Sequence, residues 1–149
     1  MFVTEEFRGR PLVDPEKCVG CGSCILVCPA GARRLIQEED RYILRYFIGQ
    51  CIFCWRCVEI CPEKAISGTT EFFFATDNWE DLFIDIKHKT VKCSYCGKTF
   101  VPQKLIINTK NKLPSEFDFD RLDICPDCKK NIGALKISIS RGIAYEDRK

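Results

Sequence analysis

Two apolar runs separated by a polar stretch lie between residues 33 and 48. Leu35-Ile36 and the run 42–48 are rich in β-branched and aromatic side chains, and the polar stretch 37–40 separates them. Two such runs around an acidic turn predict a β-hairpin. Upstream, the prolines on both sides of Leu12-Val13 exclude a helix, so this dipeptide predicts a short edge strand.

The pattern predicts two short helical segments and one packed connector. Residues 23–28 predict a short helix that Pro29 ends. Residues 77–85 begin with Asp and Asn and have further acidic residues early, which predicts a capped helical turn. The Phe-rich stretch 69–76 has too many aromatic side chains for a flexible linker, so we expect an extended segment packed on this chain or on another subunit.

Beyond residue 90 the pattern is weaker. Residues 99–101 and 105–107 predict strands, with a turn at 110–112. In the tail, from Ile132 to Tyr145, some apolar positions recur at helical spacing and others alternate as in a strand. This pattern does not choose between the two.

The cysteines add chemistry to this picture, because eight of the twelve form two copies of one spacing. Each copy reads Cys-x2-Cys-x2-Cys-x3-Cys-Pro, and a shift of 33 residues superimposes them. This is the ligand spacing of proteins with two 4Fe-4S clusters, in which the fourth cysteine of each run ligates the other cluster. The predicted ligands are Cys18, Cys21, Cys24 and Cys61 for cluster 1, and Cys51, Cys54, Cys57 and Cys28 for cluster 2.

One position breaks the repeat, because Gly22 of the first copy corresponds to Trp55 of the second. Glycines in a cluster loop supply backbone freedom. An indole at this point could shield the cluster from water, form part of a docking surface, or fill space at the rim. These alternatives stay open.

The other four cysteines form two Cys-x2-Cys units, Cys93 with Cys96 and Cys125 with Cys128. On the tips of two facing hairpins they would supply four thiolates in tetrahedral geometry, which predicts a structural zinc site. A rubredoxin-type iron is the alternative, because both metals accept four thiolates. The single histidine, His88, is not expected to be a ligand, because the quartet is already complete.

Together these elements predict an α+β chain with three parts. Residues 1–68 form a bacterial-type two-cluster ferredoxin fold, residues 69–89 a packed connector, and residues 90–149 a zinc-ribbon-like (rubredoxin-like) β lobe and C-terminal tail. Residues 1–86 carry 9 basic and 14 acidic side chains, and residues 87–149 carry 14 and 7. The basic half predicts either an acidic partner or a solvated lysine-rich surface.

The distribution of charge and cysteine also predicts a compartment. Residues 1–11 contain four charged side chains and no apolar run, so no secretory signal is expected. Apolar stretches stay well short of the roughly 18 residues of a membrane span. Paired Cys-x2-Cys units in a reducing compartment bind metals or act in catalysis more often than they form disulfides. We therefore expect a cytoplasmic location.

Three features beyond the cluster spacing narrow the match to known proteins. They are the lead-in Phe7-Arg8-Gly9-Arg10-Pro11, the opening Cys51-Ile52-Phe53-Cys54, and Thr70-Glu71-Phe72 followed by Ala75. With the two motifs they resemble the small two-cluster ferredoxin-like subunit shared by complex I and the membrane-bound energy-converting hydrogenases, formate hydrogenlyases and sulfane-reductase relatives. The four-cysteine tail resembles that of some hydrogenase-type members and favours that branch.

This resemblance implies a non-catalytic electron-transfer subunit of an oxidoreductase complex. It implies a soluble ferredoxin as the electron donor, and a cluster-bearing small subunit and a large nickel-iron or related catalytic subunit as partners. Attachment to the cytoplasmic face of the membrane would then come through partner subunits.

The residues alone leave two rival functions. One is a free-standing soluble ferredoxin, against which the aromatic run Phe72 to Phe74 argues. The other is a zinc-ribbon module for nucleic acid or assembly, although the basic tail lacks an arginine-rich stripe. The chain has no nucleotide-binding loop and no Ser/His/Asp set, so we expect no substrate turnover of its own.

Overall fold

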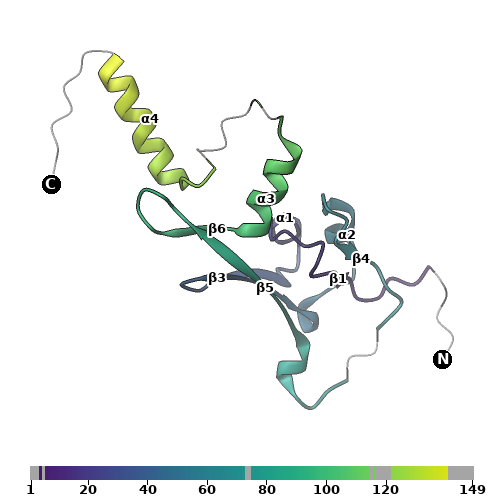
Figure 1. The fold of residues 1–149 in the computed structure, drawn as a ribbon. Helices are drawn as coiled ribbons and strands as arrows, with labels where there is room; N and C mark the ends of the chain where they lie inside the picture. Colours follow the sequence, from purple (N-terminus) through teal and green to yellow (C-terminus); the bar gives the residue numbers. More distant parts are fainter. Residues whose placement is uncertain (1–3, 5, 73–74, 115, 117–121, 141–149) are drawn as a thin grey trace.

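The computed structural model describes residues 4, 6–72, 75–114, 116 and 122–140, and its strands form two antiparallel sheets (Figure 1). The small sheet pairs β1 (Leu12–Val13) with β4 (Ile66–Ser67). The larger sheet has the order β2-β3-β5-β6. Its strands are β2 (Arg33–Gln37), β3 (Arg41–Phe47), β5 (Phe83–Lys92) and β6 (Thr99–Pro102).

Short helices follow the closely spaced cysteines of each motif. Helix α1 (Ser23–Leu26) belongs to the first motif and α2 (Arg56–Ile60) to the second, and the two helices pack against each other. Two 3-10 turns, η1 (Ile48–Gln50) and η2 (Trp79–Leu82), precede the second motif and β5. None of the helices in the described ranges is long and apolar enough to span a bilayer.

The two motifs repeat in backbone conformation even where their side chains differ. Gly20, Gly22 and Gly31 have φ angles of 72°, 79° and 60°, and 33 residues later the φ angles of Phe53, Trp55 and Lys64 are 52°, 60° and 48°. A non-glycine residue in this left-handed region costs roughly 1–3 kcal/mol. The second motif therefore adopts the shape of the first against the preference of three of its own residues.

Strand β3 forms the centre of the larger sheet, because all of its side chains except that of Arg41 are buried or partly buried. Leu44 and Tyr46 are each only 2% exposed. Leu44 packs in a cluster that includes Cys18, Cys24 and Cys57, while Tyr46 packs with Ala32 and Ile48 beside Cys28 and Cys51. The core of the sheet thus packs directly against the cysteines of both motifs.

Strand β5 adds the C-terminal part of the chain to this sheet. It pairs antiparallel with β3 from Arg41 opposite Lys89 to Phe47 opposite Phe83. The guanidinium of Arg45 donates two hydrogen bonds of 2.8 and 2.7 Å to the carboxylate of Asp85 on the neighbouring strand. Because β5 continues to Lys92 and pairs there with β6, one strand joins the predicted connector to the predicted second lobe.

The structure confirms most of the elements expected before residue 90. The hairpin corresponds to β2 and β3, the edge strand to β1, and the helix after the first motif to α1, which ends earlier, at Leu26. The capped turn is the 3-10 turn η2, in which Asn78 accepts a hydrogen bond from the Glu80 amide at 3.2 Å. Of the aromatic run, Phe73 and Phe74 lie outside the described residues, and Phe72 makes an edge contact with Phe7 at 5.1 Å.

The strand predicted at residues 105–107 and the turn predicted at 110–112 are both wrong, because both segments belong to helix α3 (Gln103–Lys112). Three consecutive apolar residues fit a strand or a helix, and the polar positions around them decide the outcome here. Lys104, Asn108 and Lys112 share one face of the helix at four-residue spacing. Lys104 bonds the carbonyl oxygen of Pro15 at 3.0 Å, and both Asn108 and Lys112 bond the carboxylate of Glu63.

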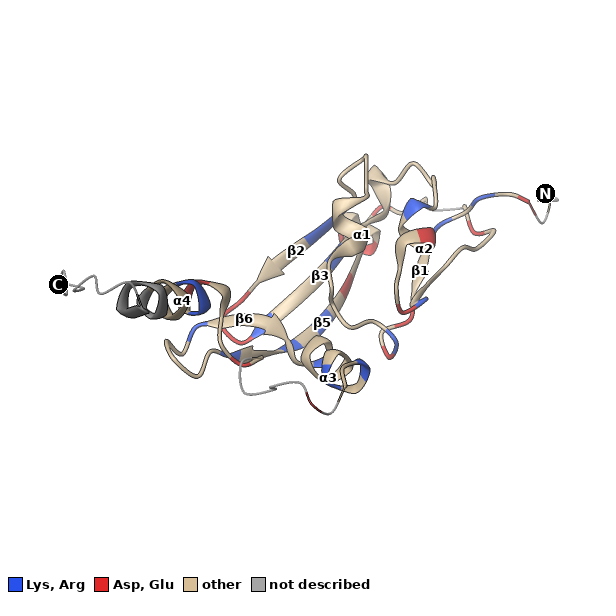
Figure 2. Ribbon diagram, turned by 90° about the horizontal axis from the view of Figure 1, so that it is seen from above, with Lys and Arg blue, Asp and Glu red and all other residues tan. Residues whose placement is uncertain are grey.

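The second Cys-x2-Cys unit is not on a hairpin tip as predicted. Cys125 immediately precedes α4 (Pro126–Ser140), and Cys128 lies in its first turn. Pro126 favours this arrangement, since proline is well tolerated in the first turn of a helix. The undecided tail is helical through Ser140, and residues 141–145 lie outside the described residues. Figures 1 and 2 show α4 at the opposite end of the molecule from β1 and α2.

Candidate metal centres

The first predicted quartet lines one cavity. Cys18, Cys21, Cys24 and Cys61 all face it, together with Leu44, Ala65 and Ile66. The first three come from the loop and helix of the first motif, and Cys61 follows α2 of the second. Sequence-distant thiols and apolar walls thus surround one space, as the crossed ligand pattern predicts.

The second predicted quartet lines a separate cavity. Its walls include Cys28, Cys51, Cys54 and Cys57, as well as Arg33, Tyr46 and Trp55. Cys28 comes from the end of the first motif and the other three thiols from the second. None of the eight cysteines of the two motifs forms a disulfide. Each cavity is lined by the four cysteines of its own quartet and by no cysteine of the other quartet.

Buried polar groups around the second cavity fit an anionic cluster. Arg33 is 2% exposed and its guanidinium lies 4.3 Å from the centre of the Tyr46 ring. Both terminal nitrogens of Arg33 and the hydroxyl of Tyr46 are buried without a hydrogen-bond partner in the part of the chain that the structure describes. Buried donors of this kind are costly unless something accepts from them. Cluster sulfides and thiolates would be suitable acceptors.

The pKa shifts of the cysteines have the same physical origin. Burial raises the pKa of Cys24 to about 11, and the nearby Arg33 charge opposes this rise. Burial likewise raises the pKa of Cys57, again opposed by Arg33. One cation therefore acts on thiols of both quartets. Metal ions would complete the compensation, because ligating thiols are deprotonated.

His88 contacts a thiol of the first quartet, a position that the sequence reasoning missed. Its side chain is 3% exposed, and its Nε2 atom lies 3.6 Å from the sulfur of Cys18. Burial lowers its pKa, as does the charge of Lys104. The pairing of β5 with β3 puts His88 opposite Tyr42, and this register could not be read from the sequence around His88.

Trp55 attaches the N-terminal lead-in to the second motif. Its indole Nε1 donates a hydrogen bond of 2.8 Å to the carbonyl oxygen of Gly9, and the Arg8 guanidinium lies 5.7 Å from its ring centre. Its ring also covers Gly68, where an added Cβ would lie 2.5 Å from Trp55 Cζ2. Trp55 also lines the second cavity. Its ring therefore fills space over Gly68 and forms part of the wall around the second quartet.

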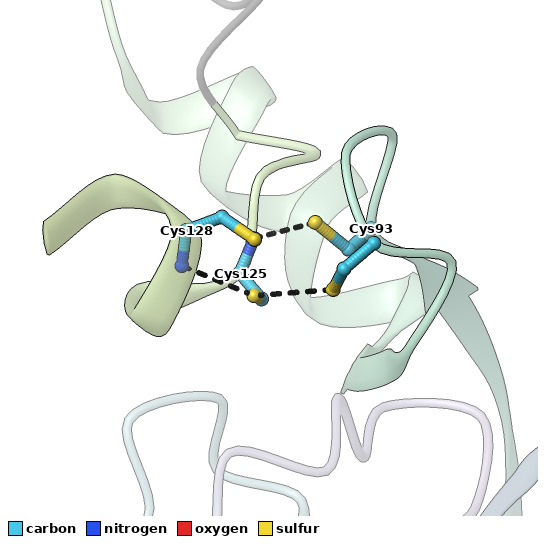
Figure 3. A group of neighbouring side chains, drawn as sticks. Cys93, Cys125 and Cys128 are labelled. Atoms are coloured by element: carbon cyan, nitrogen blue, oxygen red, sulfur yellow. Dashed lines mark hydrogen bonds between the residues drawn. The ribbon is translucent and has the colours of Figure 1, made fainter. Parts of the chain in front are cut away.

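The remaining four cysteines converge at the end of the β5–β6 hairpin. The sulfurs of Cys93, Cys96, Cys125 and Cys128 all lie within 4.8 Å of one another. Figure 3 shows Cys93, from the hairpin turn, facing Cys125 and Cys128 at the start of α4. The sulfur atoms of Cys96 and Cys125 are 3.8 Å apart. This is about the sulfur–sulfur distance in a tetrahedral site with zinc–sulfur bonds of about 2.3 Å.

Backbone amides support this quartet. The Cys125 amide donates to the Cys93 sulfur at 3.2 Å, and the Cys128 amide donates to the Cys125 sulfur at 3.5 Å. Although burial disfavours its thiolate, amide donors including that of Cys125 lower the pKa of Cys93 to about 6. Hydrogen bonding to Cys125 raises the pKa of Cys128. Ligating thiols are deprotonated, so a metal cation bound between the four sulfurs would compensate their charge.

Comparison with known proteins finds one matching family model and several similar proteins. Residues 10–62 match the family model described as a 4Fe-4S dicluster domain. Formate hydrogenlyase subunit 6 of Escherichia coli is 31% identical over 138 residues, which cover 86% of this chain and 76% of that protein. Pyruvate synthase subunit PorD of Methanocaldococcus jannaschii is 39% identical over 62 residues, or 42% of this chain and 69% of that protein. A chain in the structure of an archaeal membrane-bound sulfane sulfur reductase has a TM-score of 0.44 and 21% identity, covering 78% of this chain and 57% of the other.

Proposed function

Because this chain belongs to the family of formate hydrogenlyase subunit 6, we propose that it is an iron-sulfur subunit that relays single electrons within a membrane-bound oxidoreductase complex. The family expected from the lead-in and the two motifs is thereby confirmed. The observation that carries the proposal is the pair of cavities, each of which has three thiols from one motif and the fourth from the other.

We propose Cys18, Cys21, Cys24 and Cys61 as the ligands of cluster 1, and Cys51, Cys54, Cys57 and Cys28 as the ligands of cluster 2. When bound, the two clusters supply neighbouring one-electron redox sites. The first site has the apolar wall residues Leu44, Ala65 and Ile66, and Arg33 provides positive charge near both quartets. In this family context the donor is a soluble ferredoxin, and the acceptor is a cluster-bearing or catalytic partner subunit on the cytoplasmic face.

The four cysteines at the β5–β6 turn and at α4 form, in this proposal, a structural zinc site with zinc-ribbon-like ligation. One Cys-x2-Cys unit sits on a hairpin and the other at a helix start. A closed set of four thiolates leaves no open position for a substrate, so its role is to fasten α4 to the sheet. A rubredoxin-type iron is the competing occupant.

Metal analysis and ligand substitution test the proposal together. Protein purified without oxygen should contain about eight irons, eight acid-labile sulfides and one zinc per chain. About nine irons and no zinc would replace the zinc by iron.

Crossed ligation makes a sharper prediction. Cys28→Ser should alter the EPR signal of the cluster that Cys54→Ser alters, and Cys61→Ser that of the cluster that Cys21→Ser alters. The two variants at cluster 1 (Cys21→Ser and Cys61→Ser) and the two at cluster 2 (Cys54→Ser and Cys28→Ser) serve as controls for each other. If Cys28→Ser and Cys21→Ser affected the same cluster, the assignment would be wrong. Isolation of the native complex then identifies the partner subunits.

A further inference from the structure

His88 connects the C-terminal part of the chain to the first cysteine quartet. It lies on β5, a strand that the ferredoxin repeat does not contain, and it is buried against the loop of the first motif. A Cβ added at Gly20 would lie 3.1 Å from His88 Cδ2 and 2.9 Å from Pro102 Cγ. The loop that carries Cys18 therefore rests directly on this histidine and on the end of β6.

We propose that His88 donates its Nε2–H to the thiolate of Cys18 and thereby raises the reduction potential of cluster 1. The contact of 3.6 Å between Nε2 and the Cys18 sulfur carries this proposal. It rests on the proposed role of Cys18 as a ligand of cluster 1. His88 acts through Cys18 and is itself no ligand.

The direction of the effect follows from charge. Reduction adds one electron to a cluster that is already anionic, so a donor to a ligating sulfur stabilises the reduced state more than the oxidised state. Hydrogen bonds to the sulfurs are among the factors that determine cluster potentials. The effect is strong at this site because His88 and Cys18 are both buried, at 3% and 8% exposure.

The two cluster sites differ in this respect. The repeat position of Cys18 in the second motif is Cys51, whose sulfur accepts the Phe53 amide at 3.4 Å. The first motif has the equivalent amide, because the backbone of Gly20 bonds to Cys18. The imidazole is an addition to this shared pattern, and Cys51 has the buried phenol of Tyr46 nearby instead. His88 therefore distinguishes the electronic surroundings of cluster 1 from those of cluster 2.

A redox titration followed by EPR tests the proposal on the full chain with both clusters loaded. His88→Phe removes the donor and keeps an apolar ring, and it should shift the reduction equilibrium of cluster 1 about tenfold toward the oxidised form, or about 59 mV lower. His88→Gln places an amide N–H near the original Nε2 and should restore part of the shift. Cluster 2 is the internal control and should not change. The signal of cluster 1 is the one that Cys21→Ser alters.

A second measurement needs no variant, because His88 is the only histidine in the chain. Labelling histidine with ¹⁵N should change the pulsed-EPR nitrogen couplings of reduced cluster 1 and leave those of cluster 2 unchanged. The proposal is overturned if labelling has no effect at cluster 1, whether or not the His88→Phe protein folds. It is also overturned if both variants keep the wild-type potential with full iron content. Wild-type protein without two clusters would instead refute the proposed function.

Discussion

Replacing Trp55 by phenylalanine should loosen the N-terminal lead-in while leaving both cluster sites in place. The substitution keeps an aromatic ring but removes the Nε1–H that bonds the buried carbonyl oxygen of Gly9 at 2.8 Å. The backbone cost of the left-handed conformation at this position, where φ is 60°, is similar for both residues and cancels in the comparison. The substitution also removes the ring atoms that lie over Gly68, so the lost hydrogen bond sets a lower bound for the effect on the lead-in.

The size of the effect follows from the burial of Gly9. A buried acceptor left without its donor costs about 1–2 kcal/mol. The amides of Gly9 and Arg10 each donate a bond of 2.7 Å, to the carbonyl oxygens of Thr69 and Glu71. Opening of this local pairing exposes both amides to exchange. Their hydrogen exchange should therefore become about 5- to 30-fold faster in the Trp55→Phe protein.

Hydrogen exchange followed by mass spectrometry of a peptide that covers residues 6–12 measures this rate. Trp79→Phe is the matched control, because Trp79 is 61% exposed and packs on Phe47, away from the lead-in. Its exchange in this peptide should equal that of the wild type. Unchanged exchange in Trp55→Phe, or an equal increase in both variants, would show that the indole does not hold the lead-in.

Three further substitutions test other parts of the structure. In Gly9→Ala the new methyl group would overlap the backbone of Glu71, so the lead-in should detach and residues 6–12 should be cleaved much faster in limited proteolysis. Cys125→Ser should remove essentially all of the one zinc per chain and leave about eight irons, as measured by elemental analysis. Loss of iron in proportion to the loss of zinc would show that the two kinds of site are not separate. Arg33→Met removes a buried positive charge near both quartets, so the reduction potentials of both clusters should fall. The reduction equilibrium of each cluster should shift roughly tenfold toward the oxidised form. A fall at one cluster alone would contradict the action of Arg33 on thiols of both quartets.

Local chemistry explains what could be predicted from the sequence. The hairpin of β2 and β3 follows from apolar runs on both sides of an acidic turn, and the two quartets follow from cysteine spacing and ligand chemistry. The structure brings each quartet together at one cavity, and the ligand assignment stays a prediction until metals are measured. The family was readable because its motifs and lead-in are local in sequence.

The features that could not be predicted depend on contacts between distant residues. Helix α3 is favoured by Lys104, Asn108 and Lys112, whose partners lie more than 40 positions earlier in the chain. The left-handed conformations of Phe53 and Trp55 oppose the intrinsic preference of these residues, so no local signal predicts them. The position of His88 follows from the register between β3 and β5, for which no short-range pattern exists.

The continuity of β5 limits how the protein can be divided. A fragment that ends at residue 89 keeps all eight cysteines of the two motifs, but it loses Thr90, Val91 and Lys92, which pair with β6. Residues 83–89 of β5 pair with β3 alone in the intact protein, so the truncation leaves this pairing in place but removes α3, which packs on β5. It also removes Pro102 beside Gly20 and the Lys104 bond to the carbonyl oxygen of Pro15. A minimal two-cluster fragment of this protein is therefore expected to lose support at the loop of the first motif, although it keeps every cysteine of both quartets.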